Sequence, residues 1–179
     1  MKKIFYTVVM STLLLTTVRS LAQEKYNLDT PYDPKFKLGI GLSIGAPLQD
    51  PYESSLGGDV RLQYDFSKPY SLTLTTGYNN LFVNGSNNDL GYIPLKGGFK
   101  AFVLKDKFYL MGEAGAAFAV TNGYDKTSLL LSPTIGYATQ YIDLSLRYEH
   151  LSDFPTVEND QFNKGLGQIM IRLAYGFNL

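Results

Sequence analysis

His150 and Ser152 are the residues whose types and spacing come nearest to a catalytic arrangement. His150 is the only histidine of the chain, and Ser152 follows two positions later. Both continue the alternation of Leu146 and Tyr148, so we expect the two side chains on one outward face of a strand. A histidine and a serine oriented by a carboxylate are the minimum for acyl hydrolysis, and Glu158 is the candidate acid. A single histidine at a strand rim is also an ordinary interfacial residue, which is our preferred interpretation, so we predict no enzymatic activity.

Charged residues at alternating positions form a second candidate set. They share the face opposite the apolar residues, which predicts that they point into an enclosed interior. They are Arg61, Lys96, Glu113, Asp143, Arg147, Glu149 and Arg172, together with Lys37, Asp59, Asp65 and Lys100. A buried charge is costly without a partner, so we predict a paired plug of five acids and six bases rather than a proton or ion path. Within it we expect Glu113 to pair with Arg147 or Arg172.

Strands must position these residues, because apolar and polar residues alternate with a period of two. The last stretch, Gln168 to Leu179, shows the pattern most clearly. The eight predicted strands are about 36–45, 58–66, 70–79, 92–103, 108–120, 129–139, 142–149 and 168–179. Short turns near Ser67, Lys105 and Gln140 alternate with long connections that start near 46, 81, 121 and 151, the last of them a loop over 152–164. Pro94 and Pro133 lie within predicted strands, where we expect β-bulges because proline has no N–H.

The distribution of charge decides between a membrane barrel and a soluble sandwich. The apolar faces contain no Asp, Glu, Lys or Arg, and strands of roughly 9 to 11 residues suit a tilted membrane crossing. We therefore predict an all-β fold, an eight-stranded antiparallel up-and-down transmembrane β-barrel with a polar filled interior. Eight strands leave an interior only wide enough for side chains, so we expect no open pore.

The ends of the chain set the predicted domain organisation. Residues 1–22 have two lysines, an apolar run and small residues at the cleavage positions, which is typical of a cleaved signal peptide. Residues 23–35 are predicted to be a polar N-terminal arm, and residues 36–179 the outer-membrane β-barrel. The mature chain would carry 13 basic and 16 acidic residues, a net charge of −3, which gives no indication of nucleic-acid binding. The chain has no cysteine, so a lipoprotein anchor is excluded, and we expect no metal or cofactor.

Several stretches resemble the outer membrane protein beta-barrel domain family, the small eight-stranded barrels of bacterial outer membranes. They are YIPLKGGFKAF (92–102), FYLMGEAGAAF (108–118), SPTIGY (132–137), DLSLRYE (143–149) and IRLAYGF (171–177). The resemblance implies contact with outer-membrane lipid and lipopolysaccharide, and insertion by the outer-membrane assembly machinery. The family usually ends in a Phe that looks like the recognition signal of this machinery; here Leu179 takes that place, and Phe177 lies two residues before it.

A local stretch, RYEHLSD (147–153), resembles the His-x-Ser region of lipid A 3-O-deacylases. This resemblance implies ester hydrolysis at the outer leaflet by His150 and Ser152, with Glu158 as the acid. Our main expectation is an exported, non-enzymatic outer-membrane protein with a structural or surface-interaction role through its external loops. The alternatives are such a lipid A hydrolase and a soluble exported β-sandwich binding protein.

Overall fold

The computed structural model describes residues 32–83, 89–121, 126–158 and 161–179, apart from the side chains of 105, 106, 157, 158 and 161–163. Within these ranges the chain forms eight strands and one short helix. They are β1 (Lys35–Pro47), β2 (Tyr52–Ser67), β3 (Tyr70–Val83), β4 (Leu90–Val103), α2 (Leu104–Lys107), β5 (Phe108–Ala119), β6 (Thr127–Ala138), β7 (Ile142–Glu158) and β8 (Gln161–Asn178). The predicted signal peptide, and the predicted arm up to residue 31, lie outside the described residues.

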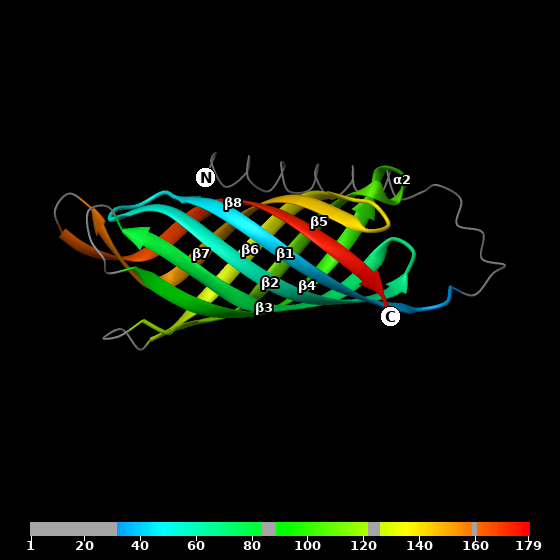
Figure 1. The fold of residues 1–179 in the computed structure, drawn as a ribbon, viewed down its shortest axis with the longest axis horizontal. Coiled ribbons are helices and arrows are strands. Elements are labelled where there is room, and N and C mark those ends of the chain that lie inside the picture. The colour runs from blue at the N-terminus through cyan, green and yellow to red at the C-terminus, as the bar shows by residue number, and fades with distance from the viewer. Residues whose placement is uncertain (1–31, 84–88, 122–125, 159–160) are drawn as a thin grey trace, which may run out of the picture. The chain divides into compact units, whose positions relative to one another are not determined.

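The strands close into one barrel. Each strand pairs antiparallel with the next in the sequence, and β8 pairs with β1, which leaves no free sheet edge. Figure 1 shows the tilted strands wrapping around a common axis, with the C-terminus at one end and the β7–β8 hairpin at the other. The predicted fold class, an eight-stranded up-and-down antiparallel barrel, is confirmed.

The two ends of the barrel differ in their connections. At one end, which we call the turn end, lie the short β2–β3 turn, α2 between β4 and β5, and the short β6–β7 turn. The other end, the loop end, carries the remaining four connections. The predicted turn at Lys105 is a single helical turn, which Leu104 enters with a positive φ of 50°. No helix in the described ranges is long and apolar enough to cross a membrane.

The alternating pattern sorts side chains to the two faces of the sheet as predicted. On β8, Leu173 is 58% exposed on the outer surface, whereas its neighbour Arg172 is 1% exposed inside. Leu173 lies between Leu42 on β1 and Leu144 on β7, and these two side chains are also exposed on the outer surface. A one-residue slip in register would exchange these two sets, so the apolar outer face fixes the register of every strand.

Three strands extend well beyond their predicted ends, and one of them is β2, which starts at Tyr52 instead of about 58. β7 continues to Glu158 and β8 starts at Gln161, so the loop predicted over 152–164 is for the most part a hairpin. Inward apolar residues account for the extension, since Phe154 and Leu166 are fully buried inside this part of the barrel. The alternation is interrupted by a register shift between Leu151 and Pro155, which hides the strand in the sequence.

The predicted β-bulges at Pro94 and Pro133 are wrong. Pro94 lies opposite Ala117 and Pro133 opposite Gly112, with no register shift in either ladder. Each proline lacks a partner only on its other neighbouring strand. For Pro94 the gap is in the β3–β4 ladder, and for Pro133 it is in the β6–β7 ladder. Because a missing N–H affects one neighbouring strand only, the strand keeps its register through its bonds to the other neighbour.

Candidate functional site

The interior of the barrel holds a network of charged side chains, which is centred on Glu113. The Glu113 carboxylate accepts a hydrogen bond from the Thr75 hydroxyl at 2.6 Å. Its other oxygen, Oε2, lies 3.4 Å from Arg61 Nη2 and 3.5 Å from Lys96 Nζ. Glu113 is 3% exposed, so two cations and one hydroxyl replace the water that it would have in solution.

The expected partners of Glu113 were wrong. Arg147 Nε instead lies 3.4 Å from Glu149, and Arg172 pairs with Asp59. The physical reason is height within the barrel, because the tilt and stagger of the strands decide which inward side chains share a level. Alternation in a sequence indicates the face of a residue but not the level at which it meets the opposite wall.

Next to this centre, Glu149 joins the plug to uncharged partners. Lys96 Nζ is 2.6 Å from Glu149 Oε1, and the Tyr92 hydroxyl donates to Glu149 Oε2 at 2.9 Å. The Gln168 amide donates to Tyr92 at 2.7 Å and accepts from the Ser55 hydroxyl at 2.7 Å. Sequence reasoning missed Tyr92, Gln168 and Ser55, since uncharged inward residues carry no signal that separates a network member from a spacer.

Arg172 and Asp59 form the best-aligned ion pair of the network. Arg172 Nε donates to Asp59 Oδ2 at 2.7 Å, and Nη2 donates to Oδ1 of the same carboxylate, so the pair is bidentate. The guanidinium lies over Gly41, where a Cβ atom would be 2.7 Å from Arg172 Cζ. The glycine therefore provides the space that this side chain fills.

A separate layer lies near the turn end. Lys100 Nζ is 2.9 Å from Asp143 and 3.3 Å from the Gln63 amide oxygen, and it lies 3.8 Å from the centre of the Tyr109 ring. The Tyr109 hydroxyl donates to Asp143 at 2.7 Å. Each of the eleven inward charged residues named above takes part in at least one ion pair.

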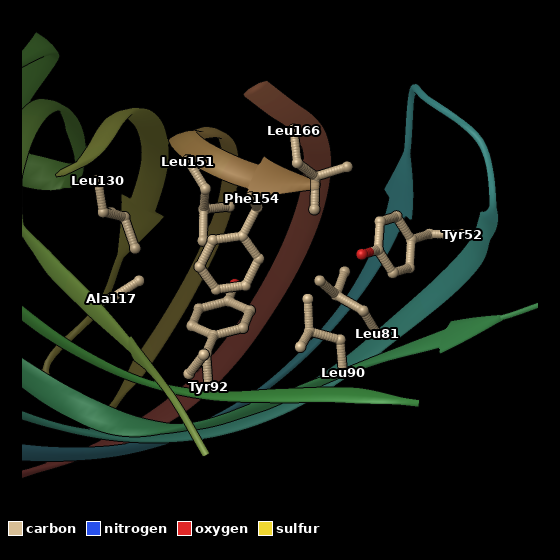
Figure 2. Packing of buried hydrophobic residues seen from close by; sticks show 10 residues of the cluster. Tyr52, Leu81, Leu90, Tyr92, Ala117, Leu130, Leu151, Phe154 and Leu166 are labelled. Atoms are coloured by element: carbon tan, nitrogen blue, oxygen red, sulfur yellow. The ribbon is translucent and has the colours of Figure 1, made fainter. Parts of the chain in front are cut away.

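At the loop end the interior is apolar. Figure 2 shows this cap, in which the Tyr92 and Phe154 rings meet edge to face with their centres 5.3 Å apart. The cap consists of Tyr52, Leu81, Leu90, Tyr92, Ala117, Ala119, Leu130, Leu151, Phe154 and Leu166. An apolar cap was not predicted, and it adds a hydrophobic core above the polar filling of the lumen.

The structure places His150 and Ser152 on β7, at the level where the cap begins. Both side chains are half-buried, and His150 lies opposite Gly167 on β8. Within the described side chains no hydrogen bond joins His150 to Ser152, and the side chain of Glu158 is not among them. The described residues also contain no group of three His, Asp or Glu side chains that could hold a metal ion.

A groove runs along the outer wall below His150. It has a volume of about 600 Å³ and is lined mainly by apolar side chains, including Phe99, Leu146 and Tyr148. Gly112 forms its floor, where an added Cβ would meet no atom within 4 Å. Tyr148 is the outward residue that directly precedes His150, so the groove leads toward the histidine.

Comparisons with solved structures identify the fold. The chain is similar to the Ail protein of Yersinia pestis, at a TM-score of 0.53 and 17% identity, with 82% of this chain and all of Ail covered. The N-terminal barrel domain of Pseudomonas aeruginosa OprF gives 0.57 at 10% identity, with 81% of this chain and all of that domain covered. A de novo designed transmembrane β-barrel gives 0.52 at 17%, covering 83% of this chain and all of the design.

These likenesses establish the architecture of a small eight-stranded transmembrane barrel of the outer-membrane type. No protein-family model matches the chain, and no curated protein matches it. Because a designed barrel is as similar as a natural one, the fold alone carries no activity. The resemblance to lipid A 3-O-deacylases around His150 stays a prediction.

Proposed function

We propose that the protein is an integral bacterial outer-membrane barrel that does not conduct, and that it acts through its loop end as a contact surface. Export would use the signal peptide at residues 1–22, and insertion would use the outer-membrane assembly machinery. The turn end would face the periplasm and the loop end the exterior, which is the usual asymmetry of such barrels.

The filled lumen is the observation that carries this proposal. Ion pairs join different strands at more than one level of the lumen. Arg172 pairs with Asp59 at one level, and Lys96 pairs with Glu149 at another. The apolar cap lies above both pairs. A conducting barrel needs a continuous wet path, whereas here Lys96 and Glu113 are 1% and 3% exposed. A lumen filled in this way supports our proposal of a barrel that does not conduct ions.

The loop end has the properties of a firm platform. The cap packs residues of β2, β7 and β8 together above the charged layers, so the strands stay paired beyond the apolar outer band. The Tyr52 hydroxyl donates to the Pro155 carbonyl at 3.0 Å, which ties β2 to the β7–β8 hairpin across the barrel. A platform of this kind would support a recognition surface at the loop end.

A first prediction concerns location and conductance. The protein should fractionate with outer membranes and migrate differently on a gel before and after heating. In planar bilayers the purified protein should give no steady conductance, and Phe154→Ala should give none either, since the ion-paired layers remain intact below the cap. Steady ion currents through the wild-type barrel, at levels that a small open porin shows, would contradict the proposal.

The groove on the outer wall favours a second function, ester hydrolysis of an outer-leaflet lipid. An acyl chain in the groove would pass Tyr148 and place its ester end at the level of His150 and Ser152. In this arrangement Ser152 would be the nucleophile and His150 its base, as the resemblance to the deacylases implies.

A second prediction tests this function by the mass of lipid A. If the hydrolase function is correct, cells that make the wild type will have lipid A lighter by one ester-linked chain. His150→Ala and Ser152→Ala will then restore the full mass, while Ser145→Ala, at an inward serine of the same strand, will not. Equal lipid A masses in all four strains would exclude the hydrolase and leave the non-enzymatic proposal standing.

A further inference from the structure

The groove on the outer wall is a hollow with an aromatic ring at each end. Phe99, Gly112 and Pro133 lie side by side on β4, β5 and β6, and Tyr148 borders the groove on β7. The rings of Phe99 and Tyr148 are 46% and 40% exposed, whereas Gly112 has no side chain to fill the space between them. Three strand spacings separate β4 from β7, so the hollow measures about 14 Å across the strands.

Neighbouring groups hold both rings in place. The centre of the Phe99 ring is 5.5 Å from that of Tyr70 and 6.3 Å from that of Phe66. The Tyr148 hydroxyl lies over Gly167, where an added Cβ would be 2.6 Å from it. The hollow is therefore preformed, and a ligand can enter it without a rearrangement of the wall.

The lining of the hollow is apolar and continuous with the rest of the outer wall. Leu146 and Ile169 complete its sides. Thr134 and Arg147 also border it, but their side chains are buried inside the barrel. The outer wall of such a barrel faces lipid chains, so the occupant of the hollow must be apolar as well.

The shape of the hollow favours a thin, flexible occupant over a second barrel. The strands of a second copy would rest on the protruding rings of Phe99 and Tyr148 and would not reach Gly112 between them. Inside hydrocarbon, apolar surfaces associate only through close packing, and a floor without a partner loses that packing. An acyl chain has no side branches and can lie along the floor between the rings.

We propose that the groove binds one acyl chain of lipopolysaccharide in the outer leaflet. Phe99 lies nearer the turn end and Tyr148 nearer the loop end. With the loop end outside, as proposed above, the chain enters beside Tyr148 and its methyl end meets Phe99. The length of about 14 Å is close to the roughly 15 Å that one leaflet contributes to the hydrocarbon core. The inference rests on this orientation and not on hydrolysis, because a bound chain needs no catalytic group.

Binding can be measured with the whole protein in nanodiscs, as wild type and as Ser152→Ala, in which hydrolysis cannot consume the lipid. Nanodiscs of phosphatidylcholine receive increasing amounts of lipid A, and backbone amide shifts are recorded. The amides of Gly112 and Ile135 at the groove should move. Those of Leu42 and Val60, on the outer wall of β1 and β2, should not.

Substitutions on the floor decide whether the groove is responsible. Gly112→Leu should weaken lipid A binding about tenfold, because the leucine displaces the methylene groups that pack there. Gly97→Leu is the matched control and should bind as the wild type does. Gly97 is also exposed on the outer wall with no atom within 4 Å of an added Cβ, but it does not border the groove. Phe99→Ala removes one end of the hollow without adding bulk and should give a smaller loss.

The gel shift on heating shows whether each variant folds, and Phe99→Ala provides the test if Gly112→Leu does not insert. Equal shifts around the whole wall, no shift at the groove, or equal affinities of Gly112→Leu and Gly97→Leu would exclude the site. A second copy that covers the groove, seen as paired barrels whose groove amides move without lipid A, would exclude it too. None of these results bears on the loop-end proposal. Unchanged lipid A masses in cells would exclude hydrolysis without excluding the bound chain.

Discussion

Arg172→Ala is expected to destabilise the barrel by about 3 to 5 kcal/mol, the cost of leaving a buried charge without its partner. Asp59 is 7% exposed and receives three hydrogen bonds from this guanidinium. Removal of Arg172 also opens a cavity over Gly41, which the guanidinium now fills. Both effects reduce the free energy of unfolding.

The measurement is urea-induced unfolding of the protein in phospholipid bilayers. Lys37→Ala is the matched control, since the Lys37–Asp65 pair has a similar distance of 3.0 Å but a lysine side chain that is 37% exposed. The control should lose only about 0.2 to 1 kcal/mol, as exposed pairs do. Similar losses in Arg172→Ala and Lys37→Ala would show that the interior is hydrated and that the plug contributes little.

Leu173→Arg is expected to cost about 2 to 4 kcal/mol, or to prevent insertion, if Leu173 faces hydrocarbon near the middle of the bilayer. Leu173 is exposed on the outer wall between Leu42 and Leu144, so an arginine there has no polar partner on either neighbouring strand. If the outer wall faced water, the same substitution would be close to neutral.

The experiment measures the free energy of unfolding of the wild type and of Leu173→Arg in bilayers. Leu48→Arg is the control for depth in the membrane. Leu48 follows β1 at the loop end and is 54% exposed. An arginine near the membrane interface costs only about 0 to 1 kcal/mol. Wild-type stability in Leu173→Arg would contradict the membrane assignment of the outer wall, whatever the result for Leu48→Arg.

The faces and the number of the strands could be read from the sequence because they depend on alternation alone. The contrast between Arg172 and Leu173 is visible in the letters, and the structure shows the same contrast in exposure. The turn near Ser67 was visible for a similar reason, since a short polar stretch with Pro69 separates two alternating runs.

Other features depend on long-range geometry that alternation does not encode. The ion partner of Glu113 follows from strand stagger, and the register shift after Leu151 conceals the end of β7. The apolar cap was missed because inward Leu81 and Leu166 are the same residue type as outward Leu173. Both inward leucines also lie just outside the predicted strands 70–79 and 168–179, so no alternation assigned them to a face.

The Arg172–Asp59 pair also constrains the order of assembly. Its two residues are 113 positions apart, on β8 and β2, and β1 lies between those strands in the closed sheet. The pair can therefore form only when the last strand docks onto the first. Until the last strand docks, both charged groups remain hydrated. A sheet that entered the bilayer before it closed would bring both charges into the membrane unpaired. Seam closure and charge burial must consequently occur as one late step, which disfavours partly inserted intermediates.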